Sequence, residues 1–216
     1  MNPRTIRITG EARKAFAPDL INVSLDHSKL FATYEEALNE VAAKTKILRQ
    51  KVIEAGLDGE TLKTTDFAVE PAYESYKDAN GNYRKRFIGY ENKASFEICF
   101  PLDNAVLSSL LGKLQDSQDK MDFSYRLSNP EEAQEEVMAL ATKAAIRKAS
   151  IIASSASVSL GEIQSIDYSV EEIRVQYQRY ALKECYSADC TGSPEVDITP
   201  RDLTFEDSVT IVFAIA

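Results

Sequence analysis

Long runs of alternating apolar and polar residues constrain the fold of this chain more than any other feature of its sequence. Such alternation is typical of a half-buried β-strand, whose successive side chains point to opposite faces. It predicts strands over residues 5–12, 21–27, 62–76, 84–100, 121–127, 162–173 and 203–216. In the run over 84–100, the face opposite Cys99 carries Ile88, Tyr90, Ala94, Phe96, Ile98 and Phe100. We therefore expect extensive sheet with one apolar face, a hairpin loop over 78–82, and pairing between the first two strands.

Three helices are expected between the strands, because three capping signals precede apolar residues at helical spacing. Thr33 and Glu36 have the spacing of a capping box, and Gly56 ends that helix. Asp103 caps a short helix over 103–114, and Asn129, followed by proline, begins a helix that runs to about residue 157. In the first helix, the residues expected to be buried are Leu38, Val41, Leu48, Val52 and Ala55. In the third helix, they are Ala133, Val137, Leu140, Ala141, Ala144 and Ile151. Small residues dominate the third set, which favours close approach to a sheet.

Few residues of this chain are suited to catalysis or to metal binding. The sequence contains one histidine, His27, and no tryptophan, so most catalytic triads and metal clusters lack a usual component. The glycine-rich motifs that bind dinucleotides or phosphates are absent, and so is the G-x-S-x-G motif of serine hydrolases. His27 lies in phase with the apolar face of its strand and is interpreted as a partly buried side chain. We therefore assign no catalytic, cofactor-binding or metal-binding residue and expect no cofactor.

The charge of the chain argues against several partners. It has 25 lysine and arginine residues against 34 acidic residues, which gives a net charge of −9. A chain this acidic repels the phosphates of nucleic acids and of anionic lipids, so no nucleic-acid partner is expected. No apolar run reaches the roughly 18 residues of a membrane span, and Met1 leads into strand-like sequence without a signal-peptide core. The sequence predicts a soluble chain without a transmembrane segment, exported only if a leader has been removed.

The segment over residues 174–202 is a long connection that holds two of the three cysteines. Connections of this length often carry function. Cys185 and Cys190 have the spacing C-x4-C, which allows one disulfide bridge in an oxidising compartment and two free thiols elsewhere. Both states remain open at this stage.

One segment combines basic and aromatic residues, namely Tyr83, Arg84, Lys85, Arg86, Phe87 and Tyr90. Such a cluster binds RNA or phosphate by stacking and ion pairing, or it protects an exposed strand edge with charge. Tyrosines also gather over 73–90 and 168–186, a bias found both at interfaces and in half-buried strands. The predicted interaction surface consists of Arg84, Arg86, Tyr90, Asn92, Tyr177 and Tyr180.

Several segments together resemble the SIMPL domain family, also called DUF541. They are RFIGYEN over 86–92, FSYRLSNP over 123–130, the Ala/Lys-rich stretch over 143–149, Leu160-Gly161, ITGEA over 8–12, Pro18-Asp19 and Ile198-Thr199-Pro200. The resemblance implies one SIMPL domain over 4–215 with an α+β fold of two-layer sandwich lobes and mainly antiparallel sheet. The lobes are expected at about 4–84 and about 85–173, the second ferredoxin-like, with the final strand 203–215 returning to the sheet. The resemblance supplies no catalytic residues.

The resemblance also implies a function and a compartment. We expect a non-enzymatic interaction protein that forms homo-oligomers and binds an unknown protein partner, related to the envelope or to stress. Bacterial relatives are mostly exported, so the expected location is the periplasm or envelope if a leader was removed and the cytoplasm otherwise. One alternative is a ligand-binding or hydrolytic enzyme whose pocket between the lobes joins Tyr90, Arg126 and an acid. Another is RNA or phosphate binding through Arg84–Tyr90.

Overall fold

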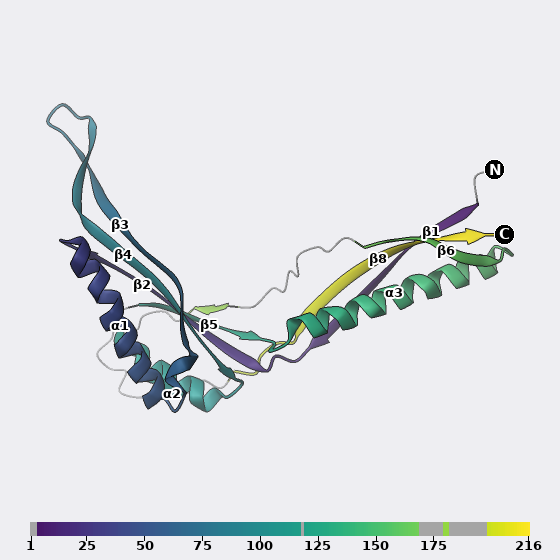
Figure 1. Ribbon diagram of the computed structural model, residues 1–216, viewed down its shortest axis with the longest axis horizontal. Helices are drawn as coiled ribbons and strands as arrows, with labels where there is room; N and C mark the ends of the chain where they lie inside the picture. The colour runs from purple at the N-terminus through teal and green to yellow at the C-terminus, as the bar shows by residue number, and fades with distance from the viewer. Residues whose placement is uncertain (1–3, 118, 169–178, 182–197) are drawn as a thin grey trace. The chain divides into compact units, whose positions relative to one another are not determined.

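The computed structural model describes residues 4–117, 119–168, 179–181 and 198–216, and their fold is α+β, as predicted (Figure 1). The described residues form three α-helices and two antiparallel sheets. The chain divides into two compact units that interleave in sequence. We call Asp19–Arg126 with Gln178–Thr199 the inserted unit, and Met1–Pro18, Leu127–Tyr177 and Pro200–Ala216 the outer unit.

The inserted unit has the element order β-α-β-β-α-β of the ferredoxin-like plait. Its elements are β2 (Leu20–Phe31), α1 (Tyr34–Glu54), the short 3-10 turn Gly59–Thr61, β3 (Leu62–Lys77), β4 (Tyr83–Pro101), α2 (Asn104–Leu114), the 3-10 turn Gln115–Ser117, β5 (Lys120–Arg126) and β7 (Arg179–Ala181). The strand order in its sheet is β3-β4-β2-β5-β7. The resemblance therefore led to the right plait but to the wrong residues, because β2 pairs with both β4 and β5 and belongs to the same sheet. The expected lobe boundary near residue 84 lies within the β3–β4 hairpin.

The outer unit consists of a three-stranded sheet and one long helix. Its elements are β1 (Thr5–Phe16), α3 (Pro130–Ser155), β6 (Leu160–Asp167) and β8 (Leu203–Ile215), with the strand order β1-β8-β6. The final strand, β8, lies between the other two strands of this sheet. The expected pairing of the first two strands is wrong: β1 pairs with β8, and β2 pairs with β4 and β5.

α3 lies close to its sheet because its buried stripe is made of small side chains. The stripe repeats every fourth residue and contains Ala133, Val137, Ala141, Ala145, Ala149 and Ala153. Beneath it, a side chain on Gly10 would place its Cβ 2.2 Å from the backbone oxygen of Ala141 and 2.3 Å from the backbone nitrogen of Ala145. Glycine at position 10 is therefore required by the close approach of α3 to β1.

The helix faces differ in part from those predicted. Leu140 and Ile151 of α3 and Leu38 of α1 are exposed, and Ala144 is half-buried. A step of four residues turns an α-helix by about 400°, so the buried stripe of α3 drifts round the helix by about 40° at each step. Because the sheet beneath α3 is twisted, a stripe that drifts round the helix stays in contact with it, whereas a straight stripe would not. The prediction assumed a straight stripe and so assigned Leu140 and Ile151 to the wrong side.

The core of the inserted unit is built from large side chains. Leu48 and Val52 of α1 and Leu107, Leu110 and Leu114 of α2 pack on the sheet residues Ile21, Val23, Phe96, Ile98 and Phe123. The predicted helix start at Thr33 is confirmed, with both hydrogen bonds of the capping box present at 3.2 Å. Cys99 is exposed on the other face of β4, as predicted. The sheet of this unit thus has one face covered by helices and one face that no helix of the described residues covers.

Candidate interaction surface

The β3–β4 hairpin continues beyond the rest of its sheet as a two-stranded ribbon. β4 pairs with β2 only from Tyr90 to Pro101, whereas β3 and β4 remain paired out to Lys77 and Tyr83. Residues 72–89, which we call the hairpin arm, therefore have only each other as strand partners among the described residues, and Figure 1 shows the ribbon passing the N-terminal end of α1. An isolated two-stranded ribbon is marginally stable in water, so the arm is a place where further contacts would add stability.

The tip of the arm is shaped by one carboxylate. Asp78 accepts hydrogen bonds from the backbone nitrogens of Asn80 and Asn82 at 2.9 and 3.0 Å, and Arg84 Nε donates to its other oxygen at 3.1 Å. These contacts, led by the Asn82 backbone, hold the pKa of Asp78 below its ordinary value. Gly81 completes the turn with a φ of 81°. The tip predicted from its turn residues is therefore an ordered hairpin turn.

Four aromatic rings form a continuous row from the arm to the start of α1. Tyr73 contacts Phe87, Phe87 contacts Tyr90 and Tyr90 contacts Tyr34, with ring centroids 5.8, 5.3 and 5.7 Å apart. All three contacts are edge-to-face, the geometry that aromatic pairs prefer. Tyr73, Phe87 and Tyr34 remain 57%, 48% and 52% exposed, respectively. We call these four residues the aromatic row.

A β-bulge brings the row onto the face that the helices cover elsewhere. Ala72 pairs with Gly89 and Tyr73 with Phe87, so Ile88 is the extra residue. Gly89 has a φ of 138°, and a Cβ there would lie 2.2 Å from the carbonyl oxygen of Phe31. Phe87, not Ile88 as predicted, thus shares a face with Tyr90. The core face of the sheet therefore continues on the arm, but no described helix covers it there.

The arginines of the predicted surface are on the arm, and each is paired with an acid. Arg84 contacts Asp78, and Arg86 forms an ion pair with Glu74 while lying over the ring of Tyr76. Both arginine side chains are largely exposed, at 64% for Arg84 and 68% for Arg86. Exposed ion pairs of this kind are weak.

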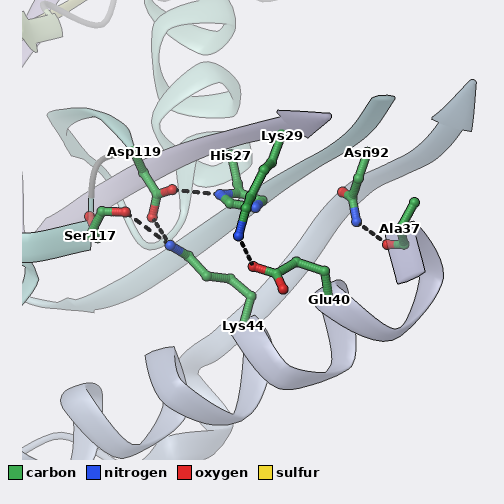
Figure 2. A network of polar contacts seen from close by, with 8 residues as sticks. All are labelled: His27, Lys29, Ala37, Glu40, Lys44, Asn92, Ser117 and Asp119. Carbon is green, nitrogen blue, oxygen red and sulfur yellow. Dashed lines mark hydrogen bonds and ion pairs between the residues drawn. The ribbon is translucent and has the colours of Figure 1, made fainter. Parts of the chain in front are cut away.

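The remaining residues of the predicted interaction surface do not lie on the hairpin arm. Asn92 is fully buried, and its Nδ2 donates to the backbone oxygen of Ala37 at 2.5 Å, so it joins β4 to α1 (Figure 2). Tyr180 stacks on Phe123 with centroids 5.1 Å apart and packs against the core. Tyr177, Cys185 and Cys190 lie outside the described residues.

A buried polar network holds α1 against the sheet (Figure 2). Asp119 lies 2.7 Å from His27 Nδ1 and, through its other oxygen, 2.7 Å from Lys44 Nζ. Lys44 also donates to the backbone oxygen of Ser117 at 3.1 Å. The side chains of His27, Lys44 and Asp119 are 9%, 12% and 1% exposed. Position in the sequence did not reveal this network, because Asp119 lies 92 residues from His27 and no motif links them.

His27 and Asp119 are the residue types of a catalytic pair, but the histidine is not accessible to a substrate. A carboxylate that orients a histidine is part of the serine-hydrolase triad. Here the free ring nitrogen, His27 Nε2, is itself buried and has no hydrogen-bond partner among the described residues. Lys44 balances the charge of Asp119, as a buried carboxylate requires. The arrangement therefore serves to anchor α1, and within the described residues no group of three or more His, Cys, Asp and Glu side chains is placed to hold a metal ion.

The two residues named for the enzyme alternative, Tyr90 in β4 and Arg126 in β5, lie beside opposite ends of β2. β2 pairs Phe31 with Tyr90 and Leu20 with Arg126. At about 3.3 Å per residue, the two ends of β2 are about 36 Å apart. Arg126 instead forms an ion pair with Glu97 at 3.1 Å. Tyr90 and Arg126 therefore do not belong to one site.

Within the described residues, no helix is both long enough and apolar enough to cross a membrane.

Comparison with known proteins gives a family and two relatives. The sequence model of the SIMPL family, described as a protein of unknown function (DUF541), matches residues 6–213. The 26 kDa periplasmic immunogenic proteins of Brucella melitensis biotype 1 and Brucella abortus strain S19 are each 26% identical to this chain over 223 residues. Each alignment covers 99% of this chain and 85% of the relative.

Proposed function

Because the chain belongs to the SIMPL family, we propose that it is a non-enzymatic interaction protein that forms homo-oligomers and uses the aromatic row of its hairpin arm as a contact surface. The observation that carries this proposal is the continuation of a core-type sheet face beyond its helices. On the arm this face presents Tyr73 and Phe87, which elsewhere in the sheet would be covered. A second copy of the chain or another protein would cover them.

The energetics favour such a contact. Burying a large apolar side chain contributes about 1.5–3 kcal/mol, and the aromatic row offers several half-exposed rings. Aromatic residues are also enriched at protein interfaces, since they supply large contact area at low entropic cost. The edge-to-face contacts order the row before any partner binds, which lowers the entropic cost of binding.

We place this activity in the periplasm or at the envelope. The support is the similarity to two periplasmic proteins along nearly the whole chain. The expected role there is contact with other proteins, with no reaction catalysed.

The test is the mass of the protein in solution. Analytical ultracentrifugation over micromolar concentrations should show a multiple of the 24.0 kDa chain mass. The double variant Tyr73→Ser/Phe87→Ser should shift towards the monomer while keeping its circular dichroism spectrum. Tyr76→Ser is the matched control, because Tyr76 is an exposed tyrosine on the opposite face of the same arm. A wild-type chain that is monomeric at every concentration overturns the proposal of assembly, and an unchanged mass in the double variant overturns the role of the aromatic row.

A further inference from the structure

The outer unit carries two open hollows on opposite flanks of α3. The larger has a volume of about 470 Å³ and is lined by Leu140, Lys143, Ala144, Arg147, Lys148 and Ile151. The smaller has a volume of about 240 Å³ and is lined by Glu131, Gln134, Glu135, Met138 and Tyr168. Each combines apolar side chains with charges of one sign, and the two signs are opposite.

The larger hollow, which we call the basic flank, lies on the side of β1. Lys148 Nζ donates to the backbone oxygen of Thr9 in β1 at 3.1 Å, which places this side of α3 over that strand. Lys143 and Arg147 are exposed and form no ion pair with any described residue. Leu140 and Ile151, which line the same hollow, are 38% and 55% exposed. In a chain with a net charge of −9, a cluster of cations around exposed apolar side chains is an unusual surface.

The smaller hollow, the acidic flank, lies on the side of β6. Tyr168 directly follows β6, the strand at the other edge of the sheet, and its hydroxyl donates to Asp207 at 3.1 Å. Gln134 donates to the same carboxylate at 2.7 Å. Glu131 and Glu135 have no ion pair with any described residue, and Met138 and the ring of Tyr168 supply the apolar part. The acidic flank therefore complements the basic flank in both charge and character.

We infer that the basic flank of one copy binds the acidic flank of a second copy, so that the chain assembles head to tail through the outer unit. This inference rests on the proposed assembly and names a surface for it that is separate from the aromatic row. Two different patches that fit each other make a heterologous contact, which repeats from copy to copy and closes into a ring or continues as a filament. Pairing either flank with itself would instead bring like charges together, which opposes association.

Reversing the charges tests the inference. The first variant carries Lys143→Glu and Arg147→Glu, and the second carries Glu131→Lys and Glu135→Lys. All of these residues are good helix formers, so α3 should be retained. Each variant alone should associate at least about tenfold more weakly than the wild type in sedimentation velocity, since it presents like charges on both flanks. Lys46→Glu/Arg49→Glu on the exposed side of α1 is the control for the change in net charge and should leave the mass unchanged.

Mixing the two variants gives the decisive result. In an equimolar mixture, each reversed flank meets an oppositely charged flank of the other variant, so assemblies with an even number of copies should return. A single chain with all four changes should also regain the wild-type mass. Loss without rescue overturns the inference, and so does an unchanged mass in both single-flank variants. A monomeric wild type overturns the proposed function as well, whereas an oligomer that ignores both flank variants overturns only this inference.

Discussion

The two units of this chain are packed in contrasting ways. The outer unit brings a helix onto a sheet through alanines and one glycine, whereas the inserted unit fills the space with leucine, isoleucine and phenylalanine. In the first case the backbones lie close together and no room is left for an added carbon. In the second case side chains fill a wider gap, and the loss of one leaves a cavity. Similar two-layer arrangements therefore respond to opposite kinds of mutation.

The largest expected effect is the loss of a large side chain from the inserted unit. Phe96 is 1% exposed, and Phe96→Ala should lower the free energy of unfolding by about 3–5 kcal/mol because it leaves a cavity. Phe67→Ala is the matched control, because Phe67 is 43% exposed on a strand of the same sheet. Urea unfolding followed by circular dichroism measures both. Equal losses would contradict the contrast between covered and open positions.

The buried network should be nearly as sensitive. Asp119→Ala leaves Lys44 buried without its carboxylate, and breaking a buried pair in this way costs about 3–5 kcal/mol. Asp167→Ala removes the carboxylate that forms an ion pair with Arg7. The side chains of Arg7 and Asp167 are 67% and 69% exposed. That surface pair should contribute only about 0–1 kcal/mol. A loss for Asp119→Ala no larger than that for Asp167→Ala would show that the network does not anchor α1.

Adding a methyl group at Gly10 should destabilise the outer unit, whereas the same change at Gly161 should cost less. Gly10→Ala places Cβ against two backbone atoms of α3, which cannot rotate away, so the helix must move at a cost of about 1–3 kcal/mol. Gly161→Ala in the same sheet meets its nearest atom only at 3.1 Å and should cost less. The midpoint of urea unfolding compares the two. If both variants unfold at the same midpoint, the helix is not held as closely as the distances indicate.

The smallest effect concerns Cys99, which lies on the face of the inserted unit's sheet that no described helix covers. Burial by its neighbours raises the pKa of the Cys99 thiol. Because the thiolate is the reactive form, alkylation by iodoacetamide should need a higher pH in the folded protein than in urea. The measurement uses the Cys185→Ser/Cys190→Ser background, so that one thiol is followed. A pH midpoint of the alkylation rate that is the same in both conditions would contradict the prediction.

Local signals predicted the elements well. The helix starts at Thr33, Asp103 and Asn129 are each confirmed by side-chain hydrogen bonds to backbone nitrogens of the first turn. The alternation over 84–100 correctly placed Cys99 on the less covered face, but it failed at the outer end, where the bulge at Ile88 exchanges the faces. A bulge residue is one that has no partner in the neighbouring strand, so it can be recognised only from the pairing of β4 with β3 and not from the periodicity of β4 alone.

The residues grouped from the sequence as one surface do not all lie together in the structure, for the same reason. Arg84, Arg86 and Tyr90 follow one another along β4, but Arg86 lies over Tyr76 on the face opposite Tyr90, and Asn92 is buried beneath α1. Tyr73 and Tyr34 complete the aromatic row from other elements. Their contacts depend on the pairing of β3 with β4 and on the direction in which α1 leaves β2.

The amino-acid sequence by itself determined where helices and strands begin and which family the chain belongs to. These properties depend on residues a few positions apart or on composition. Only the tertiary structure decided that β1 pairs with β8 across some 200 residues, that Asp119 holds His27 and Lys44, and that α3 carries opposite charges on its two flanks. Those features depend on which surfaces pack together when the chain closes on itself, and that choice is made by the sum of many weak contacts rather than by any local pattern.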